Sequence, residues 1–149
     1  MRLPAPPWLL TAAALAVVLT GCDGSPAAAP SGGSTVPAPL PAPEESAFAE
    51  GDCALAAPDV LAVGQLVPRL GEDGEVEAEV KDGLATAQER LRAVAGSAVA
   101  PAREPLDDLV LSIGLVRIRA DGNTYEPSLG EDLRAAYERT VETCTAGSS

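Results

Sequence analysis

The sequence predicts an all-α domain, a small up-down bundle of about four helices that follows a long unpatterned tract. Residues 52–146 contain segments in which apolar side chains recur at alternating steps of three and four, the spacing of one helix face. Gly and Pro residues punctuate these segments and mark their ends. Residues 23–51, in contrast, are rich in Pro, Ala, Gly and Ser and show no hydrophobic period, so they are expected to form a disordered tether.

The first segment is expected to be helical over roughly Pro58–Val67. Proline suits the first turn of a helix, so residues 52–57 are predicted to form a short lead-in turn. Pro68 then ends the helix. The apolar stripe consists of Cys53, Ala56, Val60, Val63, Val67 and Leu70.

The second segment is the longest, with a helix expected over roughly Asp73–Ala95. Asp73 is the predicted N-cap, because its carboxylate can accept hydrogen bonds from the free N–H groups of the first turn. Gly96 and Ser97 close the helix. The stripe consists of Val76, Val80, Leu84, Ala87, Leu91 and Val94.

The third segment is predicted to be a helix over roughly Pro105–Ala120 that ends at Gly122. Its main stripe is Leu106, Leu109, Val110, Ile113, Val116 and Ala120, and Leu111, Leu115 and Ile118 are apolar as well. A helix that is apolar on several faces is expected to be the most buried of the bundle. The alternative is a β-hairpin over residues 118–125 around Asp121-Gly122.

The fourth segment is predicted to be helical over roughly Leu129–Cys144. Ser128 with Glu131 three residues later is the pattern of a capping box, which marks a helix start. The stripe consists of Leu129, Leu133, Ala136, Tyr137, Thr140, Val141 and Cys144, and residues 147–149 are expected to be a disordered tail.

Near the N-terminus, an apolar run over residues 8–19 follows Arg2 and leads to Leu19-Thr20-Gly21-Cys22. This stretch resembles the lipobox of bacterial lipoproteins. The resemblance implies that residues 1–21 are a signal peptide, that cleavage falls between Gly21 and Cys22, and that Cys22 carries a lipid. The run is too short to span a bilayer, which takes about 20 apolar residues. The protein is therefore expected to be lipid-anchored at the extracytoplasmic face of the cell membrane.

If Cys22 carries lipid, Cys53 and Cys144 are left as one pair in an oxidising compartment. They are expected to form a disulfide, the alternative being two free buried thiols. In an up-down bundle, the start of the first helix and the end of the fourth lie at the same end. The bundle and the disulfide therefore support each other.

The chain is strongly acidic, with a formal net charge of −12. Such a surface repels nucleic acid and anionic lipid headgroups, so no nucleic-acid partner is expected and the lipid on Cys22 must supply the attachment to the membrane. The prolines of residues 22–51 favour extended polyproline II, which would make this tether a spacer between the membrane and the domain at 52–146.

Catalytic, cofactor-binding and metal-binding residues are not predicted. The chain has no histidine, and it lacks a Gly-rich phosphate loop, a Cys-x-x-Cys pair and a Gly-x-Ser-x-Gly elbow. An acidic run could gather divalent cations, but it fits a solvated helix face better; it consists of Glu72, Asp73, Glu75, Glu77, Glu79 and Asp82. The stretch Asp121–Glu126 has a faint likeness to a calcium loop and is interpreted as a turn.

Every predicted helix contains a glycine within its apolar pattern: Gly64, Gly83, Gly114 and Gly130. Tolerance of glycine is the preferred explanation, ahead of close helix packing and of room for a ligand. The expected function is that of a non-enzymatic binding or adaptor module, which recognises an envelope protein or a cell-wall component. The alternative is a carrier of a small hydrophobic ligand in the bundle core. A pocket between the stripes would favour the carrier, and an exposed apolar patch would favour the binding module.

Overall fold

The computed structural model describes residues 38–146, and every regular element in that range is helical. The predicted all-α fold is confirmed. Two short 3₁₀ helices accompany the four α-helices: the elements are η1 (Glu45–Ala47), α1 (Asp52–Leu66), η2 (Val67–Arg69), α2 (Ala78–Ser97), α3 (Arg103–Asp121) and α4 (Pro127–Thr145).

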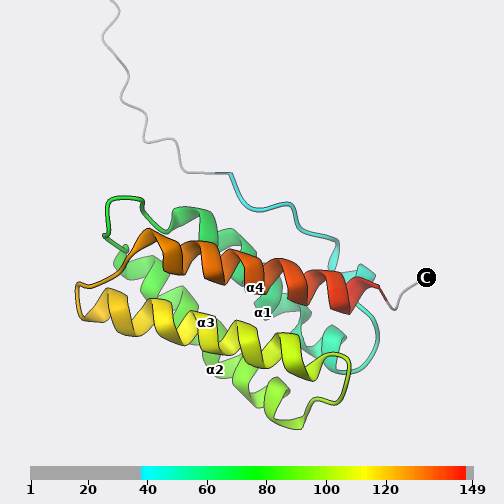
Figure 1. The fold of residues 1–149 in the computed structure, drawn as a ribbon. Helices are drawn as coiled ribbons and strands as arrows, with labels where there is room; N and C mark the ends of the chain where they lie inside the picture. Colours follow the sequence, from blue (N-terminus) through cyan, green and yellow to red (C-terminus); the bar gives the residue numbers. More distant parts are fainter. Residues whose placement is uncertain (1–37, 147–149) are drawn as a thin grey trace, which may run out of the picture. The chain divides into compact units, whose positions relative to one another are not determined.

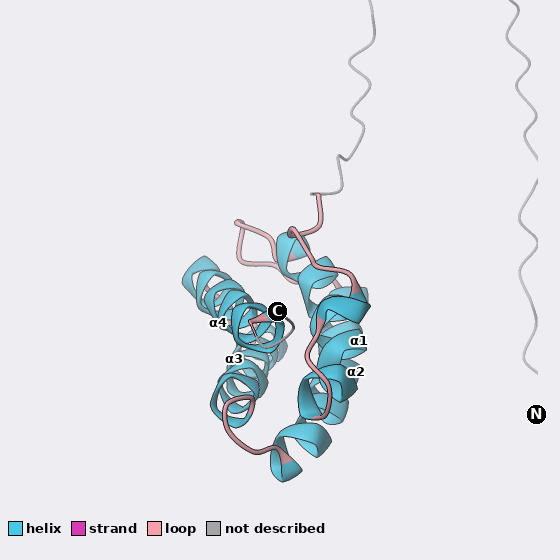
Figure 2. Ribbon diagram, turned by 90° about the vertical axis from the view of Figure 1, so that its right-hand side faces the viewer, coloured by secondary structure: helices cyan, strands magenta, loops and turns pink. Residues whose placement is uncertain are grey.

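The four α-helices form the predicted up-down bundle, seen along its length in Figure 1 and from one end in Figure 2. Both α1 and α3 pack against α2 and α4. The predicted stripes supply most of the core. The side chains that are fully excluded from solvent come from all four α-helices, and most of them are stripe residues. The largest of these are Tyr137, Leu84, Leu91, Leu106, Leu109, Ile113 and Leu133.

Helix α1 begins at Asp52, so the prediction that it starts at Pro58 is wrong. Pro58 lies inside the helix, where it cannot donate a hydrogen bond to the carbonyl group of Ala54. Both Pro58 and Ala54 are exposed, so water can take the place of the missing donor. The buried residues before the proline, Cys53, Ala56 and Ala57, hold that first turn against the core.

Helix α2 begins at Ala78, five residues after the predicted N-cap. The carboxylate of Asp73 instead accepts a hydrogen bond from the backbone N–H of Glu75, at 3.3 Å, within the loop that precedes the helix. Gly74 has φ of +85°, a left-handed conformation that breaks any helix through this loop. The helix therefore starts only after the loop has turned.

Helix α3 runs to Asp121 with Gly122 as its C-cap, which confirms the predicted stop and excludes the hairpin. The chain then turns at Asn123, which has φ of +52°. Helix α4 starts at Pro127 with Glu126 as its N-cap and without a side-chain capping bond. The predicted capping box at Ser128 is therefore wrong, because proline at the first helical position places Ser128 inside the first turn.

Residues 38–51, here called the strap, were expected to belong to the tether but pack on the bundle. The backbone N–H of Leu40 donates to the carbonyl of Gly64 at 3.2 Å, and that of Ala49 donates to the carbonyl of Cys144 at 2.8 Å. Phe48 is buried in the core and Leu40 packs against it. These two side chains and two backbone hydrogen bonds join the strap to the bundle, although its sequence has no hydrophobic period.

Candidate interaction surface

The predicted lipidation and cleavage residues, Cys22 and Gly21, lie outside the described residues. Of the helices within residues 38–146, none combines the length and the apolar character needed to cross a bilayer. The expectation of a lipid anchor therefore stays a prediction from the sequence.

The predicted disulfide is present. The sulfur atoms of Cys53 and Cys144 are 2.07 Å apart, and the bond joins residues separated by 91 positions. Cys53 lies in the first turn of α1 and Cys144 in the last turn of α4, at the same end of the bundle. Both residues are buried, so the bond belongs to the core.

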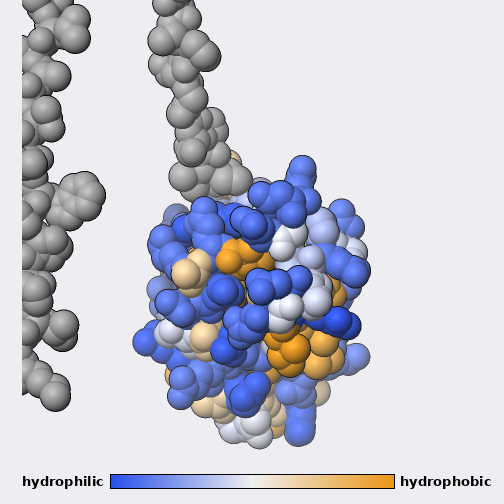
Figure 3. Space-filling view, turned by 90° about the vertical axis from the view of Figure 1, so that its left-hand side faces the viewer, coloured by the Kyte–Doolittle hydropathy of each residue, from blue (hydrophilic) through white to orange (hydrophobic). Residues whose placement is uncertain are grey.

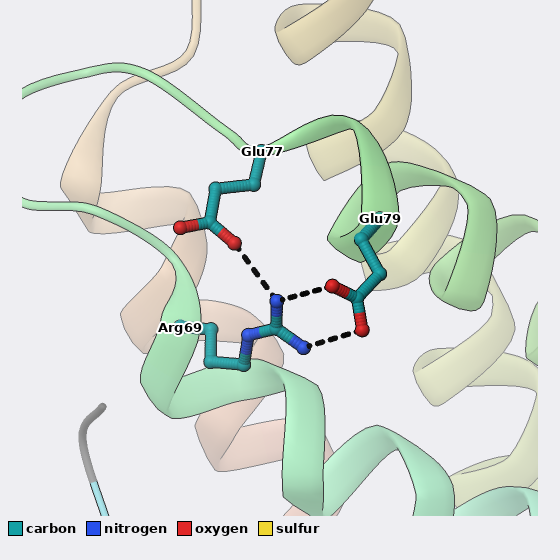
Figure 4. Close-up of polar contacts among 3 residues, drawn as sticks. All are labelled: Arg69, Glu77 and Glu79. Atoms are coloured by element: carbon teal, nitrogen blue, oxygen red, sulfur yellow. Dashed lines mark hydrogen bonds and ion pairs between the residues drawn. The ribbon is translucent and has the colours of Figure 1, made fainter.

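The acidic run is exposed, but only Glu79 and Asp82 belong to α2. The other four acids lie before the helix, so the interpretation of the run as a helix face is wrong for them; they are Glu72, Asp73, Glu75 and Glu77. Among residues 38–146, no cluster of three or more potential metal-ligating side chains occurs. Two of its carboxylates instead bind Arg69, which Figure 4 shows. The guanidinium donates to both carboxylate oxygens of Glu79, at 3.2 and 3.0 Å, and to Glu77 at 2.8 Å. These bonds close the loop between η2 and α2.

The contact with Arg69 lowers the pKa of Glu79, mainly through the hydrogen bond and then through the nearby positive charge. A carboxylate with a lowered pKa stabilises the fold above its unfolded pKa, and this contribution is lost as the pH falls through the folded pKa. We therefore expect Arg69→Ala to destabilise the protein at neutral pH and to approach the wild type in stability at acid pH.

Urea unfolding of both proteins at several pH values from 7 down to 3 measures this difference. Arg139→Ala is the matched control, since Arg139 forms a longer exposed pair with Asp108 at 3.7 Å. A stability difference between wild type and Arg69→Ala that stays constant or grows as the pH falls would show that the Arg69 contact does not act through the ionised carboxylate.

The stretch Asp121–Glu126 makes the predicted turn between α3 and α4, with Asp121 as the last residue of α3. The backbone N–H of Thr124 donates to the carbonyl of Arg119 at 2.8 Å. Asp121 forms an exposed ion pair with Lys81 at 3.9 Å. Tyr125 is buried and anchors the turn, and burial raises the pKa of its hydroxyl.

The helix glycines permit close packing, so simple tolerance of glycine does not explain them. A methyl group on Gly64 would lie 2.7 Å from the ring of Tyr137, and one on Gly83 would lie 2.8 Å from Leu66. At Gly114 the nearest atom is the amide nitrogen of Gln88, at 2.7 Å. The space beside each of these three glycines is therefore filled by a side chain of another helix.

Two open cavities lie near the ends of the bundle. The larger, of about 1070 Å³, is a groove between η2 and the start of α4; its lining includes Leu40, Leu70, Tyr125, Gly130 and Arg134. The smaller, of about 730 Å³, lies beside Cys53 and includes Val99 and Pro101. Both cavities are open to solvent, and neither is lined by stripe residues from all four helices.

The most distinctive surface feature is an apolar stripe on α3, here called the α3 stripe, formed by Leu111, Leu115 and Ile118. These side chains are 63%, 44% and 71% exposed, so the prediction that α3 is the most buried helix is wrong. Steps of four and three place them on one face, turned away from Leu109, Ile113 and Val116 in the core. Apolar patches on the hydrophilic surface are visible on the face drawn in Figure 3.

One signal in the sequence could have identified this surface. Helix α3 is apolar along two stripes, but a helix at the corner of a four-helix bundle has only two neighbours and buries one broad face. A second stripe must then point outward. An interior polar contact confirms the orientation, because Gln88 of α2 donates to the carbonyl of Val110 and accepts from Arg117.

Comparison with protein-family models, with curated proteins and with solved structures finds no match to this chain.

Proposed function

We propose that this protein is a cell-envelope lipoprotein whose helical domain is a non-enzymatic binding module, and that the α3 stripe is its contact surface. The observation that carries the proposal is the exposure of three large apolar side chains, Leu111, Leu115 and Ile118, on one face of α3. Contiguous exposed apolar side chains bordered by polar ones are typical of interaction sites.

The lipid anchor is the second part of the proposal and rests on the lipobox at residues 19–22. It would hold the domain at the extracytoplasmic face of the cytoplasmic membrane. The disulfide supports this placement, since such bonds persist in oxidising compartments. Between Cys22 and Ala38, a proline-rich chain of this length could extend over roughly 50 Å at about 3.1 Å per residue.

Membrane attachment is expected to depend on Cys22. In Cys22→Ala, lipid transfer has no thiol to modify, so the mature-size lipidated protein should disappear from the membrane fraction. Fractionation, with mass spectrometry of the N-terminal peptide, measures this. Cys53→Ala is the control, because Cys53 is bonded in the folded domain and should leave lipidation unchanged. A lipidated Cys22→Ala protein at the membrane would disprove the anchor.

The binding surface is tested by site-specific photo-cross-linking in intact cells. A photoreactive side chain at position 115 should give a discrete cross-linked product, which is lost when Ile118→Ser is added. The matched control places the same group at Leu55, which is 67% exposed but lies on α1. Equal products from positions 115 and 55, or none from position 115, would contradict a contact surface on α3.

The carrier remains the alternative, and the groove between η2 and α4 is the observation in its favour. Leu40, Leu70 and Tyr125 give part of that groove an apolar lining. A hydrophobic ligand that co-purifies from membranes and is lost in Leu70→Asp would support the carrier. The filled spaces beside Gly64 and Gly83 argue against a ligand in the bundle core itself.

A further inference from the structure

The α3 stripe has the geometry of one half of a helix–helix contact. Leu111, Leu115 and Ile118 follow the four-three spacing of a coiled-coil seam and extend over about two turns, roughly 10 Å. The stripe is a ridge on a helix whose backbone hydrogen bonds are internal, so it offers no sheet edge to an extended peptide. A second helix with its own apolar stripe is the occupant that can bury it.

The charges around the stripe determine the kind of helix. Four carboxylates are exposed on α3, those of Glu104, Asp107 and Asp108 before the stripe and that of Asp121 after it, and they outnumber the two exposed arginines of the helix, Arg103 and Arg119. The ion pairs of Asp107, Asp108 and Asp121 are 3.8, 3.7 and 3.9 Å long and solvent-exposed, so they hold these carboxylates weakly. With a net charge of −12 over the whole chain, the field around the domain attracts a cationic partner.

We propose that the partner presents a basic amphipathic helix, whose apolar stripe packs on Leu111, Leu115 and Ile118 while its Lys or Arg residues meet the carboxylates of α3. This inference rests on the proposed function and adds the chemistry of the partner. The binding helix would lie along α3, on the face that points away from the bundle core.

Other occupants fit the described surface less well. A second copy carries the same net charge of −12, so two copies repel each other where a basic helix is attracted. An anionic membrane surface is repelled by the carboxylates of α3. The tether sequence, residues 23–37, contains only one aliphatic side chain larger than alanine besides its prolines, Val36.

The test uses the full protein purified from membranes in detergent and three synthetic peptides. The first is a helical peptide with Leu at four-three spacing and flanking Lys residues. The second has the same Leu residues with Glu in place of Lys, and the third has the composition of the first with the Leu residues scattered. Fluorescence anisotropy measures their dissociation constants, and hydrogen exchange locates the contact.

The basic amphipathic peptide should bind and protect α3, and the Glu and scattered peptides should bind at least about tenfold more weakly. Ile118→Ser should weaken binding of the first peptide by about tenfold, and the matched Leu55→Ser by less than about twofold. Asp107→Asn should weaken it by severalfold and reduce its salt dependence.

Equal binding of the Lys and Glu peptides, or of the ordered and scattered ones, would overturn the inference. So would an affinity that Ile118→Ser leaves unchanged. If position 115 still cross-links to a partner in cells while no peptide binds, the proposed function stands and the inference about the partner fails. A cross-linked product of twice the chain mass would assign the surface to a second copy.

Discussion

Loss of the disulfide is expected to lower the free energy of unfolding by about 4–5 kcal/mol, because the bond closes a loop of 91 residues in the unfolded chain. A domain of this size is stable by only about 5–15 kcal/mol. Cys53→Ala, or reduction of the wild type, should therefore lower the melting temperature by roughly 20 °C or more. The helices should persist in the protein that remains folded.

Thermal unfolding followed by circular dichroism measures this effect, and thiol labelling reports the oxidation state. The double variant Cys53→Ala/Cys144→Ala is the control, since it removes the bond without leaving a single buried thiol. The strap should loosen as well, because Ala49 is hydrogen-bonded to the carbonyl of Cys144. An unchanged melting temperature after complete reduction would show that the bond has no structural role.

Gly64→Ala is expected to destabilise the protein even though alanine is the better helix former. The added methyl group would lie 2.7 Å from the ring of Tyr137, which is 1% exposed and has little room to move. Overpacking of a core costs about 1–3 kcal/mol, while the gain in helix propensity is at most about 1 kcal/mol. The melting temperature should therefore fall.

The matched control is Gly96→Ala in α2, where an added methyl group meets no atom within 4 Å. That substitution should leave stability unchanged or raise it. In Gly64→Ala/Tyr137→Leu, the smaller side chain gives room to the methyl group, so the combined loss should be smaller than the sum of the single losses. A rise in stability in Gly64→Ala, as in Gly96→Ala, would disprove close packing at this site.

Local chemistry was enough to predict the existence of all four helices and the end of α3, and it failed at most of the helix starts. The stripes of α2 and α4 carry their periodicity in the residues themselves, and Gly122 ends α3 because of its place after the last stripe residue. The starts depend on contacts that the apolar pattern of the helix does not contain. Pro58 is tolerated inside α1 because the turn before it is buried, and Asp73 is drawn into a loop that Arg69 closes.

The sequence by itself determined the fold class, the acidic surface, the expected lipid site at Cys22 and the pairing of Cys53 with Cys144. These follow from residue types, their order and the period of an α-helix, which need no knowledge of the neighbours. Only the tertiary structure decided that the strap joins the bundle, that Tyr137 fills the space beside Gly64, and that Leu111, Leu115 and Ile118 face solvent. A hydrophobic residue type shows that burying the side chain lowers the free energy. Whether another helix is in position to bury it depends on the tertiary arrangement.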